Sequence, residues 1–212
     1  DVNANTHPYI STGLHEHKFG VPIADAIQLY RRAAAMKGLR PVGVSVHIGS
    51  QINDFSAFAE AMTRVAELVR QLRAEKINIS YVDAGGGLGI DYKTDESLSA
   101  FDARAEAYAR AITTPLSGLS VHLILEPGRS LVARAGVLLT RVLYTKRNGS
   151  KQFAVVDAAM NDLLRPALYQ AYHRIQAVTQ SKESSVRYDV VGPVCESGDF
   201  LGRDRQLSAL QQ

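Results

Sequence analysis

The chain repeats one pattern three times: a segment with helical periodicity precedes a short apolar run, and the run ends in a glycine-rich or polar loop. The helical segments are residues 24–37, 55–75 and 98–112, and the apolar runs are residues 41–46, 77–82 and 119–125. Short buried strands that alternate with helices are typical of a parallel sheet, whose strands end at one shared edge. We therefore expect an α/β fold, namely part of a (β/α)8 barrel, with a doubly wound sheet as the alternative.

The pattern changes near residue 130. Residues 130–144 and 151–157 are rich in β-formers and are joined by the turn dipeptide Asn148-Gly149. Residues 163–177 could be partly helical, residues 187–191 form another expected strand, and the chain ends straight after a polar loop. We therefore expect two domains: residues 1–130 as the later part of a barrel, and residues 131–212 as the start of a β-rich domain.

Composition and charge exclude several classes of protein. The chain is 46% hydrophobic and 21% charged, as in ordinary globular proteins. Its net charge of +3 is spread without a dense basic block, which argues against nucleic-acid binding. No apolar run approaches the ~20 residues that span a bilayer. The single cysteine, Cys195, excludes an internal disulfide and suits the cytoplasm.

The glycine run Gly85-Gly86-Gly87 follows the second apolar run directly. Successive glycines let backbone N–H groups approach a phosphate closely. The spacing differs from the dinucleotide-binding fingerprint, and no helix follows at once. Taken alone, the run is better explained by a tight turn.

Polar residues end the first and third apolar runs. After the first, His47 could stack on a flat cofactor and Ser50 could contact its phosphate. After the third, Glu126 could keep an aromatic ring nitrogen protonated, and Arg129 suits a carboxylate or phosphate. A structural histidine and a surface turn with an ion pair are the plainer interpretations. His7, His15 and His17 lack nearby cysteines or paired carboxylates, so we expect no metal site.

Two further segments lie in the second expected domain. Arg165 and Tyr169 place a cation and a phenol four residues apart, which suits a substrate with two charged ends. Cys195 stands beside Glu196 and close to Asp199. Carboxylates disfavour a thiolate, so a protonated thiol that acts as a general acid fits better than a nucleophile. A packed loop and a buried inert cysteine are the alternatives.

Taken together and in this order, these segments resemble the alanine-racemase-like, fold-type III decarboxylases of basic amino acids. The segments that carry the resemblance are residues 47–52, 83–90, 126–132, 157–169 and 192–199, with residues 7–13 and 18–20 in agreement. The family combines a (β/α)8 barrel with a β-domain and uses pyridoxal 5′-phosphate. The resemblance implies decarboxylation of a basic amino acid, and residues 157–169 and 192–199 favour diaminopimelate over ornithine, arginine or carboxynorspermidine.

The resemblance also implies a role for each motif. His47 would stack on the pyridoxal ring, and Glu126 would face its nitrogen. Phosphate contacts would come from Ser50, Gly85, Gly86, Gly87, Gly128 and Arg129. Substrate would be bound by Arg129, Arg165, Tyr169 and Glu196, and Cys195 would donate a proton. A homodimer would share its active sites, with the loop that carries Cys195 reaching the cofactor of the partner subunit.

One departure concerns the cofactor-bearing lysine of the family, which belongs to an early barrel strand. Lys18, Lys37 and Lys76 lie in the wrong sequence contexts. The chain starts at Asp1 and stops at Gln212, so we expect it to be truncated at both ends and inactive alone. A non-catalytic regulatory homologue is the rival interpretation from another functional class.

Overall fold

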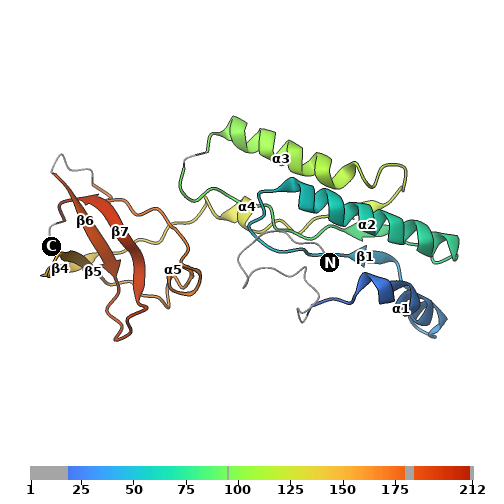
Figure 1. Cartoon of the computed structure of the whole chain (residues 1–212), viewed down its shortest axis with the longest axis horizontal. Helices are drawn as coiled ribbons and strands as arrows, with labels where there is room; N and C mark the ends of the chain where they lie inside the picture. The colour runs from blue at the N-terminus through green and yellow to red at the C-terminus, as the bar shows by residue number, and fades with distance from the viewer. Residues whose placement is uncertain (1–18, 95, 180–183, 211–212) are drawn as a thin grey trace. The chain divides into compact units, whose positions relative to one another are not determined.

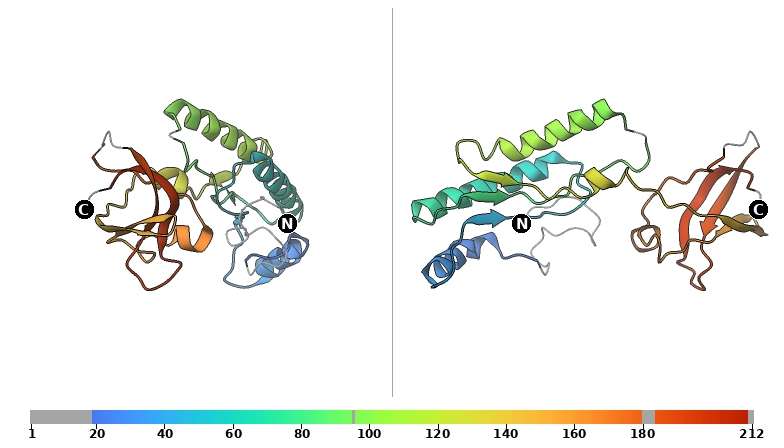
Figure 2. Two further views of the ribbon diagram at one scale, coloured as in Figure 1. Left: turned by 60° about the vertical axis from the view of Figure 1, so that its left-hand side comes forward. Right: turned by 180° about the vertical axis from the view of Figure 1, so that it is seen from behind.

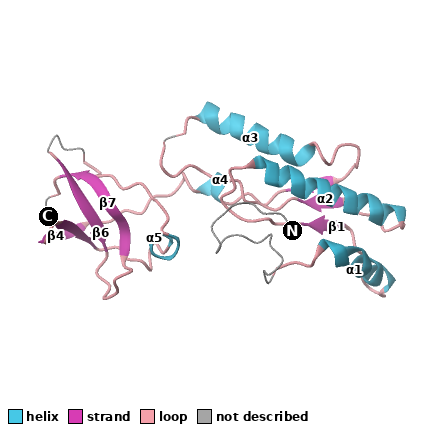
Figure 3. Cartoon of the chain, viewed as in Figure 1, coloured by secondary structure: helices cyan, strands magenta, loops and turns pink. Residues whose placement is uncertain are grey.

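The computed structural model describes residues 19–94, 96–179 and 184–210. The chain divides into two compact units (Figure 1). Unit 1 comprises Asp1–Ile90 and Glu96–Ala135, and unit 2 comprises Asp91–Asp95 and Gly136–Gln212. Helices predominate in unit 1 and strands in unit 2 (Figure 3).

Unit 1 is built on a parallel sheet of three strands in the order β1-β2-β3. Its elements, in chain order, are α1 (Ile23–Ala35), β1 (Gly43–Ser45), α2 (Phe55–Ala74), β2 (Tyr81–Asp83), α3 (Leu98–Thr113), β3 (His122–Ile124) and α4 (Arg129–Val132). Val44, Val82 and Leu123 lie side by side in register. Each strand is thus connected to the next through a helix, as the sequence pattern predicts.

The apolar face of α2 forms the core of unit 1. The helix starts at Asp54, whose carboxylate accepts a hydrogen bond from the Ser56 N–H at 2.9 Å. Val69 and Leu72 of α2 are fully buried in the same cluster as Val82 of β2. Helices α2 and α3 lie side by side over the sheet (Figure 2). This packing fixes the strands, and hence the loops at their ends.

Unit 2 is a mixed sheet in the order β4-β5-β6-β7. Its elements are β4 (Val142–Asn148), β5 (Lys151–Val156), α5 (Arg165–Tyr169), β6 (Ser185–Val191) and β7 (Phe200–Ser208). The β4–β5 and β6–β7 pairs are antiparallel, whereas β5 and β6 are parallel. Gly149 turns the first hairpin with φ 56°, as the Asn148-Gly149 signal predicts.

Two local expectations were wrong, and the expected partial helix within residues 163–177 is short. Residues 129–132 form the short helix α4, and the strand expected from residue 130 begins only at Val142. Helix α5 covers only five residues, because Gln170 adopts a left-handed conformation with φ 51°. The final polar segment is strand β7: the buried Leu201 and Leu207 anchor it beside β6, while Arg203 and Asp204 are exposed and Arg205 is half-buried.

Within the described ranges, no helix is long and apolar enough to cross a membrane.

Candidate active site

The loops that follow β1, β2 and β3 continue the sheet past the ends of the strands. The Val46 N–H donates to the Asp83 carbonyl at 2.9 Å, and the Ala84 N–H donates to the Ile124 carbonyl at 3.0 Å. The Glu126 N–H donates to the Gly85 carbonyl at 2.8 Å. The carboxyl ends of parallel strands lie at one edge of a sheet, so these bonds bring the predicted polar segments together.

Two glycines of the run let the three loops approach so closely. A Cβ on Gly86 would lie 2.2 Å from the carbonyl oxygen of Glu126. A Cβ on Gly85 would lie 2.4 Å from the carbonyl oxygen of Val46, and its φ of +67° also disfavours other residues. The glycine run is therefore the middle layer between the loop of His47 and the loop of Glu126.

His47 lies against the glycine run. Its Nδ1 accepts a hydrogen bond from the Gly86 N–H at 3.3 Å, so a neutral imidazole carries its proton on Nε2. The residue is exposed, although its neighbour Ile48 is buried in the core. An exposed flat ring is suited to stacking on a planar ligand.

Two of the three glycine N–H groups are engaged within the protein. The Gly86 N–H donates to His47, and the Gly85 N–H donates to the carboxylate of Asp83 at 2.8 Å. An anion cradled by this loop would therefore rely on Gly87 and on neighbouring donors rather than on all three glycines. We therefore expect phosphate contacts from the Gly87 end of the run rather than from all three glycines.

Gln51 connects the three loops, and sequence reasoning gave it no role. Its amide donates to the Ile90 carbonyl at 2.5 Å and accepts from the Ile90 N–H at 3.3 Å. The same side-chain oxygen accepts from Nη1 of Arg129 at 3.1 Å. Gln51 thereby orients the expected anion-binding arginine from 78 residues away in the chain. No local sequence signal predicts that contact.

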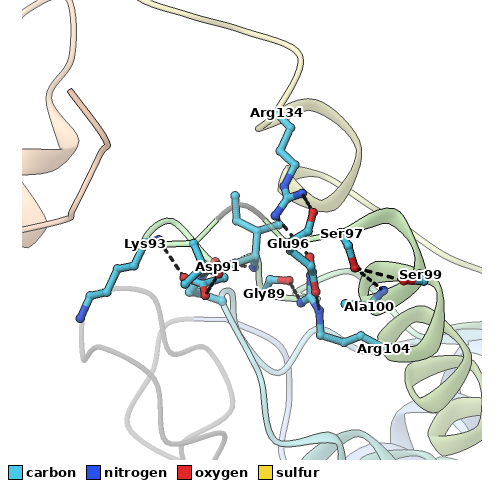
Figure 4. Close-up of polar contacts among 12 residues, drawn as sticks. Gly89, Asp91, Lys93, Glu96, Ser97, Ser99, Ala100, Arg104 and Arg134 are labelled. Carbon is cyan, nitrogen blue, oxygen red and sulfur yellow. Dashed lines mark hydrogen bonds and ion pairs between the residues drawn. The ribbon is translucent and has the colours of Figure 1, made fainter. Parts of the chain in front are cut away.

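An ion-pair network contacts the end of the glycine loop at Gly89 (Figure 4). Arg104 of α3 forms a bidentate pair with Glu96 through two contacts of 2.9 Å, and the side chains are only 19% and 11% exposed. Arg104 also donates to the Gly89 carbonyl, and Arg134 donates to the Glu96 carbonyl at 2.8 Å. The network ties α3 and the segment after α4 to the end of the glycine loop.

The remaining predicted residues of unit 1 lie on the same loops. Ser50 is half-buried in the loop of His47, whereas Glu126 and Gly128 are exposed after β3. Gly128 has φ −110° and ψ −95°, which side-chain-bearing residues avoid, and it starts α4. Unit 1 thus collects an imidazole, a carboxylate, a guanidinium and exposed backbone within adjoining loops.

Unit 2 holds Arg165 between aromatic rings. Its guanidinium carbon lies 5.4 Å from the ring centre of Tyr92 and 5.6 Å from that of Tyr169. Within the described part of the chain, Arg165 Nε is buried without a hydrogen-bond partner. The proximity of Arg165 and Tyr169 agrees with their expected pairing, whereas Tyr92 was missed because it lies far away in the sequence.

Cys195 lies in an exposed turn, so the alternative of a buried inert cysteine is wrong. The buried Asp199 fixes this turn. Its carboxylate accepts hydrogen bonds from the Met160 N–H at 2.6 Å and from the Val194 N–H at 2.8 Å. Glu196 is exposed and accepts from the Gly198 N–H at 3.1 Å. Asp199 thus connects two of the segments that carry the sequence resemblance.

Two of the lysines set aside by sequence reasoning lie away from the strand-end loops. Lys37 and Lys76 are exposed beyond the ends of α1 and α2, where the chain turns toward the amino ends of β1 and β2. Lys18, His7, His15 and His17 lie outside the described residues. Among the residues that the structure describes, no three His, Cys, Asp or Glu side chains gather as a metal site would require.

Residues 1–133 match the pyridoxal-binding domain of the pyridoxal-dependent decarboxylases. The chain therefore belongs to this family of decarboxylases, and the strand-end loops described above lie within the matched domain.

Among its relatives are the diaminopimelate decarboxylases of Pseudomonas aeruginosa, 51% identical over 98% of this chain, and of Neisseria meningitidis serogroup A, 50% identical over 98% of it. The chain covers 49% and 50% of those two proteins, so it spans about half the length of the curated relatives it matches.

The solved structure of diaminopimelate decarboxylase from Helicobacter pylori complexed with L-lysine superposes on this chain with a TM-score of 0.90. The two are 45% identical, and the match covers 99% of this chain and 51% of the other. This likeness confirms the expected fold class, part of a (β/α)8 barrel followed by a β-rich domain, over the doubly wound sheet.

Proposed function

We propose that this chain belongs to an enzyme that decarboxylates meso-2,6-diaminopimelate to L-lysine and CO2 with pyridoxal 5′-phosphate as cofactor. The observation that carries the proposal is the convergence of His47, the glycine run, Glu126 and Arg129 on one edge of the parallel sheet. The relatives named above carry the same activity in their names.

The residues of unit 1 fit this cofactor. Pyridoxal phosphate presents a flat ring, a ring nitrogen and a phosphate. The exposed imidazole of His47 would stack on the ring, and the Glu126 carboxylate would keep the nitrogen protonated. Ser50, the backbone around Gly87 and Gly128, and Arg129 would hold the phosphate. When bound, the cofactor supplies an electron sink that allows an amino acid to lose CO2.

The residues of unit 2 account for substrate choice and for proton delivery. Arg165 carries a positive charge that pairs with no carboxylate within the described residues, so it would bind a carboxylate of the substrate. Arg129, Tyr169 and Glu196 would contact its other polar groups. The exposed Sγ of Cys195 would hold the proton that replaces the lost CO2 on the substrate carbon.

We further propose that the enzyme is a cytoplasmic homodimer with shared sites, in which Cys195 serves the cofactor of the partner subunit. The exposed position of Cys195 supports this assignment, since the thiol is available to a group outside its own loop. The single cysteine of the chain agrees with a reducing compartment.

A substrate panel tests the proposed function. The full-length gene product is supplied with pyridoxal phosphate and with meso-diaminopimelate, ornithine, arginine or carboxynorspermidine, and CO2 release is measured. We expect release from meso-diaminopimelate, with lysine as the product. CO2 release from another amino acid alone would mean that the enzyme is a different decarboxylase. No CO2 release from any of the four substrates would favour the non-catalytic homologue.

A further inference from the structure

The guanidinium of Arg165 is held by aromatic rings rather than by carboxylates. The ring centres of Tyr92 and Tyr169 lie 5.4 and 5.6 Å from its central carbon, within the range of cation–π attraction. A carboxylate partner would neutralise the charge, whereas aromatic rings restrain the side chain and leave its charge available. This arrangement is suited to an arginine that binds an anionic ligand.

Tyr92 is itself restrained by a ring contact and by the turn in which it lies. Its ring meets the ring of His173 edge to face, with centres 5.0 Å apart. The turn around it is closed by Asp91, whose carboxylate accepts from the Lys93 N–H at 2.7 Å and from the Thr94 hydroxyl at 2.5 Å. Tyr92 therefore presents a fixed ring to the long and flexible side chain of Arg165.

We propose that Tyr92 is a positioning residue that holds the guanidinium of Arg165 in the orientation in which it binds a substrate carboxylate. This inference rests on the proposed function. It makes Tyr92 a determinant of specificity for ligands that have a carboxylate for Arg165 to bind. Tyr92 follows the glycine loop by three residues, since Gly89 ends that loop. Because Tyr92 lies far from Arg165 in the sequence, the sequence alone does not predict this role.

Two inhibitors that differ by a carboxylate test the inference in the full-length gene product. Inhibition constants are measured for L-lysine, which has a carboxylate, and for cadaverine, which has none. We expect Tyr92→Leu to raise the lysine constant and the KM for meso-diaminopimelate by about 3- to 30-fold, the range that cation–π energies imply. The cadaverine constant, kcat and the absorbance of bound cofactor should stay unchanged.

Three further variants separate positioning from general damage. Tyr92→Phe keeps the ring and should restore wild-type constants. Tyr144→Leu makes the same exchange at an exposed position of β4 and should change nothing. If thermal unfolding shows that Tyr92→Leu does not fold, Tyr92→Met, which keeps the bulk without the ring, takes its place.

Arg165→Ala provides the reference for the proposed function. If Arg165→Ala raises the lysine constant but the Tyr92 variants do not, Tyr92 has no positioning role and the proposed function stands. If meso-diaminopimelate is not decarboxylated by the unmodified protein, or Arg165→Ala leaves lysine binding intact, the assignment of Arg165 fails and the inference fails with it.

Discussion

At the scale of single residues, the site depends on the absence of side chains in the glycine run. Gly86 has no space for a methyl group, because a Cβ would stand 2.2 Å from the carbonyl oxygen of Glu126. Real Cβ atoms do not approach an oxygen so closely, so the loops of β2 and β3 would have to separate. The same loops carry the hydrogen bond from Gly86 to His47.

We expect Gly86→Ala to lower the free energy of unfolding by about 1–3 kcal/mol, the usual cost of overpacking. It should also weaken cofactor binding, since His47 and Glu126 are displaced together. Denaturant unfolding and cofactor titration of the full-length gene product measure the two effects. Gly136→Ala is the matched control, because a Cβ there meets no atom within 4 Å. Equal behaviour of the two variants would contradict the close packing.

Single residues also show the limits of sequence reasoning. The glycine run, His47 and Glu126 stand directly after apolar runs, so their meeting at one edge follows from the pattern alone. The role of Gln51 in orienting Arg129, and that of Asp199 in anchoring the turn of Cys195, could not be identified in this way. Their partners, Arg129 and Met160, lie 78 and 39 residues away, and only the folded chain brings them together. The cofactor, substrate and catalytic roles of all the predicted site residues stay predictions.

At the scale of elements, the half-buried pair of Glu96 and Arg104 connects α3 to the glycine loop. Removing Arg104 leaves the partly buried Glu96 carboxylate with only the 3.4 Å contact to the exposed Arg134 as compensation. An exposed pair on the same helix, Glu106 with Arg110, offers a contrast because its side chains are 71% and 68% exposed. The two pairs should therefore differ in their contribution to stability.

We expect Arg104→Met to lower the free energy of unfolding by up to about 3 kcal/mol, at the lower end for a broken buried pair. Arg110→Met should change it by less than about 1 kcal/mol. The double variant Glu96→Gln/Arg104→Met should be less destabilised than Arg104→Met, because it also removes the carboxylate, which would otherwise keep only its 3.4 Å contact with Arg134. Urea unfolding compares the variants, and an equally small effect at both arginines would refute the supporting role of Arg104.

In unit 2, Asp189 of β6 connects three strands. Its carboxylate accepts from Lys151 Nζ of β5 at 2.8 Å and from the Asp204 N–H of β7 at 2.8 Å. Burial alone would raise the pKa of Asp189, but these hydrogen bonds and the charges of Lys151 and Arg203 lower it overall. The contribution of Asp189 to stability therefore depends on pH.

We expect Asp189→Asn to destabilise the protein at pH 7 and to matter less in acid. The lowered pKa means that the native carboxylate stabilises the fold above the unfolded pKa of about 3.9, and that this contribution is lost as pH falls through the native pKa. Unfolding free energies at about pH 7 and pH 3 measure the difference, with the exposed Asp102→Asn as control. A difference between wild type and Asp189→Asn that stays constant with pH would be the contrary result.

Elements were easier to predict from sequence than their ends. Helices α2 and α3 and the strands β2 and β5 follow from apolar periodicity, which burial enforces. Strand β7 was missed because Arg203, Asp204 and Arg205 interrupt its apolar pattern, and pairing with β6 decides its structure. Helix α4 was missed because the backbone of Gly128 redirects a β-rich segment.

At the scale of the whole molecule, the proposed residues divide between the two units. The residues proposed for the cofactor lie in unit 1, and those proposed for proton delivery and for most substrate contacts lie in unit 2. Sequence order indicated a change of fold near residue 130, but it gave no sign that residues 91–95 group with unit 2. We propose that both sets of residues act in one decarboxylase site, shared between two subunits.

A complementation measurement tests whether two subunits share the site. In the full-length gene product, Cys195→Ala should bind cofactor and substrate yet turn over about 10²–10⁴-fold more slowly. Glu126→Ala should be defective through its cofactor site. After subunit exchange, about half of the dimers are mixed and one of their two sites is intact, so about a quarter of wild-type activity should return. A fully active Cys195→Ala, or no recovery despite proven exchange, would contradict the account.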